Sequence, residues 1–176
     1  MKRTSFSHRY LPEFVYGGID GAVTTFAVVA GALGASLSAS IILILGFANL
    51  FADGFSMAVS NYLSTKSRRE LVKHTRQTTR VETPLSTAFA TFASFLLVGF
   101  VPLLSFVIGL WVVSFEPHTF TYSFILTGIA LAIVGGVKGI VVKKSVPYAA
   151  LETLVIGGVA AALAFAVGFV LRGIIA

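Results

Sequence analysis

The sequence has 176 residues, of which 56% are hydrophobic and only 11% are charged, and its mean hydropathy is +0.93. This composition lies far outside the range of soluble domains, so the chain is expected to be an integral membrane protein. Cysteine is absent, which excludes disulfide bonds, thiolate metal sites and cysteine nucleophiles.

Five apolar runs in the sequence are long enough to cross a bilayer, which takes about 20 helical residues. They lie at roughly 14–35, 40–63, 87–113, 120–142 and 148–172. The first run follows a basic N-terminus, as in a signal peptide, but it exceeds the usual ~7–15 residues and contains Asp20. We therefore predict a retained helix there, and an all-α integral membrane protein with five transmembrane helices in a single domain, 1–176.

The basic residues indicate how these helices are oriented. Apart from Arg172, every lysine and arginine precedes the first run, lies in the short segment 64–84 between the second and third runs, or closes the fourth run. The positive-inside rule then predicts a cytosolic N-terminus and an extracytosolic or lumenal C-terminus. Because this bias accounts for the net charge of +6, no nucleic-acid partner is expected.

Two local features follow from the segments around the second and third runs. The basic segment after the second run carries Lys66 and Glu70 at i,i+4 spacing, so that helix is expected to continue into the cytosol before Pro84 resets the chain. Pro102 interrupts the third run and should bend the helix near its middle.

Two charged residues near the predicted cytosolic boundary have alternative interpretations. Lys138, in the fourth run, either extends its ammonium group to the interface or pairs with Glu152 at the start of the fifth run, and we favour the first. Glu152 is also a candidate for a cytosolic entrance to an ion path.

Carboxylates occur inside the first two apolar runs, although one at the bilayer centre costs about 2.5–3.5 kcal/mol. Asp20 lies in the first run. The second run carries a polar stripe at successive i+4 positions, formed by Asn49, Asp53, Met57 and Asn61. Since residues four apart share one helix face, this stripe is expected to face protein or water rather than lipid.

These side chains suit the coordination of a divalent cation. Carboxylate and amide oxygens bind hard ions, and the thioether of Met57 adds a preference for transition metals. A proton held by Asp20 or Asp53 and released when metal binds would give proton-coupled exchange. The alternative is that the polar groups only join helices, and for Asn49 and Asn61 both alternatives stay open. Taken alone, Met57 is ordinary apolar filler.

The motifs GGIDGAVTTFAVVAGALGA and LGFANLFADGFSMAVSNYLSTKS resemble the vacuolar iron transporter family, and the likeness continues through TPLSTAFATFASFLLVGFVPLL and ETLVIGGVAAALAFAVG. The resemblance implies five spans, a cytosolic N-terminus, and a homodimer that exports ferrous iron or manganese in exchange for protons between its two subunits. It also implies that Asp20 of the DG motif and Met57 of the SM motif line the path. Spacing alone adds Asp53, Asn49 and Asn61 to the predicted metal site.

Two departures from the family pattern define this chain as a short form. Well-studied members carry a cytosolic metal-binding domain rich in glutamate and methionine between the second and third helices, whereas 64–84 is too short and mostly basic. Asn61 stands in SNY where many members have glutamate in GEY, which lowers the charge of the site. The choice between iron and manganese is therefore left open.

A transporter implies no enzymatic activity and no cofactor, because Fe²⁺ or Mn²⁺ is the substrate; its partners are the metal ion, the proton, the bilayer and a second copy. One rival prediction is a membrane scaffold whose polar residues only join helices. Another is an intramembrane aspartyl protease in which Asp20 and Asp53 share a proton, although the expected YD and GxGD contexts are missing. The absence of a targeting sequence favours a prokaryotic cell membrane over a vacuolar or other organelle membrane.

Overall fold

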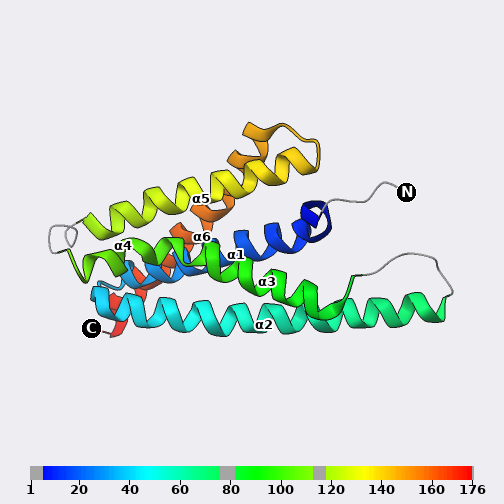
Figure 1. Ribbon diagram of the computed structural model, residues 1–176. Helices are drawn as coiled ribbons and strands as arrows, with labels where there is room; N and C mark the ends of the chain where they lie inside the picture. The colour runs from blue at the N-terminus through cyan, green and yellow to red at the C-terminus, as the bar shows by residue number, and fades with distance from the viewer. Residues whose placement is uncertain (1–5, 76–81, 113–117, 176) are drawn as a thin grey trace.

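The computed structural model describes residues 6–75, 82–112 and 118–175 (Figure 1). The helices in these ranges are α1 (Phe6–Gly34), α2 (Ala39–His74), α3 (Pro84–Gly99), α4 (Val101–Gly109), α5 (Thr119–Val141) and α6 (Val146–Ile175), and the same ranges contain no strand. Four helices are long and apolar enough to cross a membrane, and α3 with α4 makes a fifth if the bent pair is one span. The predicted all-α membrane fold is confirmed, while the orientation of the termini stays a prediction.

The bend expected in the third span is present. α3 and α4 meet at Phe100 with an angle of 46° between them. Pro102 causes it, because proline has no N–H for the helical bond and its ring excludes the carbonyl one turn earlier. The carbonyl of Pro102 accepts a hydrogen bond of 2.6 Å from the Ser123 hydroxyl of α5, which fixes the bent segment against its neighbour.

α2 is much longer than a membrane span. Its 36 residues correspond to about 54 Å of helix, against about 30 Å of hydrocarbon. The predicted continuation of this helix is confirmed as far as His74, where the backbone N–H of Thr75 caps it by bonding to the Leu71 carbonyl at 2.9 Å. Residues 76–81 of the predicted basic segment, and residue 113 of the predicted third span, lie outside the described residues. Pro84 opens α3, as the sequence indicates.

α1 is the central helix, since it contacts each of the other five. Gly17 and Gly21 lie against α3, where a Cβ atom at either position would overlap the backbone carbonyls of Thr91 and Phe95. Gly135 on α5 meets α6 in the same way. The small residues of these helices therefore allow neighbouring helices of one subunit to pack closely together.

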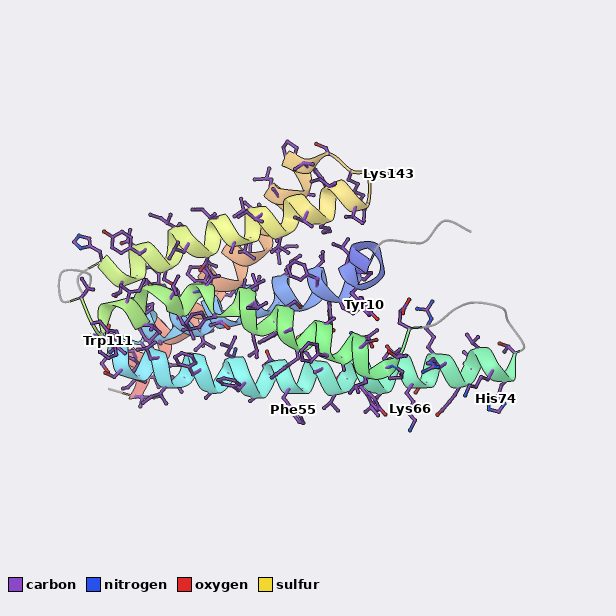
Figure 2. All side chains as sticks on the ribbon, viewed as in Figure 1. Tyr10, Phe55, Lys66, His74, Trp111 and Lys143 are labelled. Carbon is purple, nitrogen blue, oxygen red and sulfur yellow. The ribbon has the colours of Figure 1, made fainter. Side chains whose placement is uncertain are left out.

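Figure 1 and Figure 2 together show which connections lie at each end of the bundle. The start of α1 at Tyr10, the end of α2 at His74 and the α5–α6 connection at Lys143 lie at the same end. Trp111, after α4, lies at the opposite end. The fold thus gathers the basic connections on one side, which is the arrangement that the charge distribution predicts.

Candidate functional site

Asp20 lies in the middle of α1 and is half-buried. It lines a groove of about 550 Å³ whose other walls come mainly from apolar residues of α1 and α5, with Lys138 also present. Its backbone carbonyl accepts a 2.8 Å hydrogen bond from Thr24, but its carboxylate makes no hydrogen bond or ion pair within the described residues. The carboxylate is therefore available as a ligand.

The fold brings Asp53 of α2 towards Asp20 of α1. The two carboxylates are near enough to interact electrostatically, and Asp53 is also half-buried. They do not hydrogen-bond to each other in the described structure. Two like charges in an apolar environment are costly, so a proton or a cation between the two helices would lower that cost.

Met57 lies one turn further along α2 and lines a second cavity, of about 400 Å³. One side of Met57 packs against the apolar core. The other residues around this cavity are polar or aromatic, and they are Tyr16, Ser56, Ser60, Asn61 and Ser64. A soft thioether is thus placed among hydroxyl and amide oxygens, a mixture that favours a transition metal over magnesium.

Asn61 takes part in a hydrogen-bond network between α2 and α3. Its amide nitrogen donates to the Thr91 hydroxyl at 2.7 Å, and its amide oxygen accepts from Thr65 at 3.2 Å. Thr87 extends the network by donating to Thr65 at 3.2 Å. Asn61 therefore joins helices, as the packing alternative expected, and its amide oxygen retains a second lone pair.

Asn49 precedes Asp53 by about one turn of α2. Its amide nitrogen is buried and has no hydrogen-bond partner among the described residues, and the residue lines neither the Asp20 groove nor the Met57 cavity. Twelve residues separate Asn49 from Asn61, which is about 18 Å along a helix. One ion cannot touch both, so the stripe on α2 is a series of separate positions.

Lys138 and Glu152 form an ion pair between α5 and α6, with 3.0 Å between Nζ and Oε2. Both side chains are about one-third exposed, at 31% and 39%. The favoured expectation, that Lys138 extends alone to the interface, is wrong; the pairing alternative is the one present. The role of Glu152 as an entrance stays a prediction.

Sequence reasoning missed Glu13 on α1. Its Oε2 atom is buried and makes no hydrogen bond in the part of the chain that the structure describes. It lines a third cavity, of about 180 Å³, together with Pro12, Tyr16 and Asn61. The signal was present in the sequence, since Glu13 and Asp20 are seven residues apart and so share a face of α1.

Within the described ranges, no three histidine, cysteine, aspartate or glutamate side chains converge as a metal site. The predicted residues are instead distributed over the Asp20 groove, the Met57 cavity and the length of α2. A complete coordination shell would need ligands such as Met57, serine hydroxyls or water, or side chains from a second copy.

The helical bundle, with its long apolar helices, defines an all-α multi-pass membrane protein. The model of the VIT family matches residues 11–83 and 76–169, so the chain belongs to this family.

Curated relatives share parts of the chain. It is 43% identical over 74 residues to "Vacuolar iron transporter" of Toxoplasma gondii, a match that covers 42% of this chain and 24% of the relative. It is 37% identical over 62 residues to "Vacuolar iron transporter" of Plasmodium falciparum, covering 35% and 23%. A longer match, 27% identical over 210 residues, links it to "Vacuolar iron transporter 1" of Eucalyptus grandis and covers 87% of this chain and 83% of that protein.

Proposed function

We propose that this protein exports ferrous iron, manganese or both from the cytosol in exchange for protons, along a path at a homodimer interface. The observation that carries the proposal is the carboxylate of Asp20, which has no hydrogen-bond or ion-pair partner within the described residues and lies within electrostatic range of Asp53 on α2. Membership of the VIT family and the names of its relatives support a metal as the substrate.

The proposed path has several successive binding positions. Asp20 binds the metal and carries the exchanged proton, and Asp53 shares the charge from the facing helix. Met57 supplies selectivity through its thioether. Asn61 contributes its amide oxygen beside Met57, and Asn49 contributes the same group further along α2. Positions about 6 Å apart along α2 allow an ion to move between weak sites without being trapped at one.

The outer face of α2 supports a second copy as the partner. Ser56, Ser60 and Ser64 are exposed on a subunit taken alone, and Tyr16 is 60% exposed beside them. Exposing polar groups to the lipid hydrocarbon, without protein or water to bind them, is energetically unfavourable. In a homodimer this face would meet its copy, which would double the ligands around the path.

Two rival functions remain as outcomes to be tested. An aspartyl protease needs its two carboxylates to share a proton directly. The absence of a hydrogen bond between Asp20 and Asp53 favours an ion or water path instead. A scaffold function explains the Asn61 hydrogen bonds between α2 and α3, but it does not explain a carboxylate at Asp20 that joins no helices.

The host membrane is part of the proposal. The relatives in Toxoplasma, Plasmodium and Eucalyptus are named as vacuolar, which fits an organelle membrane. The prokaryotic cell membrane predicted from the sequence has no support from these names.

The proposal is tested by Fe²⁺ and Mn²⁺ uptake into proteoliposomes, with and without an imposed pH gradient. Flux that depends on the gradient in the wild type, and that Asp20→Asn reduces to the level of empty liposomes, is the expected result. Glu70→Gln, at an exposed acid on the cytosolic extension of α2, is the matched control and should transport normally. Equal flux in wild type and Asp20→Asn would contradict the proposal and favour the scaffold.

A further inference from the structure

Tyr16 is shared by all three cavities of the site. It lines the Asp20 groove, the Met57 cavity and the small cavity at Glu13. Tyr16 is exposed, and Glu13 and Asp20, three residues before it and four after it, lie on the same face of α1. Seven residues of helix correspond to about 10 Å, so one ion cannot bind both carboxylates.

The Glu13 carboxylate lacks compensation where it lies. A buried carboxylate oxygen without a partner loses its hydration and gains nothing in return. The residues lining its cavity are Pro12, Tyr16 and Asn61, and none of them carries a positive charge. The cavity of about 180 Å³ has room for a cation that retains some of its water.

The neighbouring Asn61 is held in position for such a cation. Its amide nitrogen is used by Thr91, and its oxygen is held on the other side by Thr65. These bonds fix the plane of the amide while a lone pair of the oxygen stays free, which is how supporting hydrogen bonds orient a ligand. Carboxylate, amide and phenol oxygens are all hard ligands.

We propose that Glu13, Tyr16 and Asn61 form a separate divalent-cation site, at the end of the bundle that carries the basic connections. The inference rests on the proposed function insofar as the cation held there is the one transported onward to Asp20. Because its ligands are all oxygens, this site binds Mn²⁺ but discriminates poorly between Mn²⁺ and Mg²⁺. Capture at Glu13 therefore precedes selection at Met57, and it supplies a first contact for the metal in a chain whose 64–84 segment is short and basic.

The test is equilibrium Mn²⁺ binding to the full-length protein in nanodiscs, measured by electron paramagnetic resonance of the free ion. An Asp20→Asn background removes the central site. In that background Glu13→Gln is expected to weaken the remaining binding by at least about tenfold, as loss of a ligand does, and excess Mg²⁺ is expected to displace Mn²⁺. Glu70→Gln in the same background is the control and should leave the curve unchanged. Superimposable curves with and without Glu13→Gln would overturn the proposal.

A second variant covers the case in which Glu13→Gln does not fold. Asn61→Asp adds a carboxylate to the same cavity and should tighten Mn²⁺ binding in the Asp20→Asn background; unchanged or weaker binding counts against the site. Because binding is measured without a gradient, its outcome is separate from that of the flux experiment. Protein that binds Mn²⁺ through Glu13 but never transports it would refute the proposed function and leave the site standing.

Discussion

The ammonium group of Lys138 on α5 lies 3.0 Å from the carboxylate of Glu152 on α6. Lys138 also lines the groove of Asp20, so the ion pair withholds from Asp20 the nearest positive charge in that groove. The pair also joins two helices that otherwise meet through small and apolar residues.

The first prediction concerns this ion pair. A double-mutant cycle with Lys138→Met and Glu152→Gln is expected to give a coupling free energy of about 0.2–1 kcal/mol, because both side chains are about one-third exposed and solvent screens the attraction. The measurement is thermal unfolding in detergent. Strictly additive effects of the two substitutions would show that the pair adds nothing to stability.

The second prediction concerns Asp53. Asp53→Asn removes the carboxylate and leaves the shape of the side chain intact. If the proposed function holds, Fe²⁺ and Mn²⁺ flux should fall by about tenfold or more, since one of the two carboxylates proposed for the path is lost. The initial rate of uptake into proteoliposomes measures this effect. Flux equal to that of Glu70→Gln would remove Asp53 from the path.

The third prediction separates the two metals. Met57→Leu conserves volume but deletes the soft ligand, so the ratio of Fe²⁺ to Mn²⁺ flux should fall by up to about tenfold, which corresponds to about 1.4 kcal/mol. Competition between the two ions in one uptake assay gives the ratio directly. A ratio that stays constant while both fluxes fall would assign Met57 to packing, consistent with its contact with the core.

The fourth prediction tests the central position of α1. Gly21→Ala places a methyl group onto the backbone carbonyl of Phe95, and overpacking of this kind costs about 1–3 kcal/mol. The melting temperature of the purified protein is expected to drop by several degrees. Gly158→Ala on α6 is the matched control, because a Cβ atom there meets nothing within 4 Å. Equal melting temperatures for the two variants would mean that α1 and α3 can move apart to accept the added methyl group without loss of stability.

Much of the fold could be predicted because its causes are local. A bilayer requires about 20 apolar residues for each helix, and the sequence shows such runs directly. The missing N–H of Pro102 predicts the bend between α3 and α4 without knowledge of any neighbour. Helical spacing likewise places Asp53 and Met57 on one face of α2.

The partners of individual polar groups could not be predicted from the same patterns. Asn61 bonds to Thr91, thirty residues away on α3, and nothing in the threonines of that helix distinguishes this one in advance. Lys138 could reach either the interface or Glu152 with its flexible side chain. Such choices depend on which helix faces are in contact.

The sequence by itself determined the class of this protein, the number of candidate spans and the presence of acids within them, because hydrophobic length and helical periodicity are properties of short segments. Only the tertiary structure decided that Asp20 and Asp53 come within electrostatic range, that Gly17 and Gly21 of α1 pack against α3, and that Glu13 shares a cavity with Asn61. The physical reason is that close packing brings together residues from distant segments, and the orientation of each helix about its axis settles which of them meet.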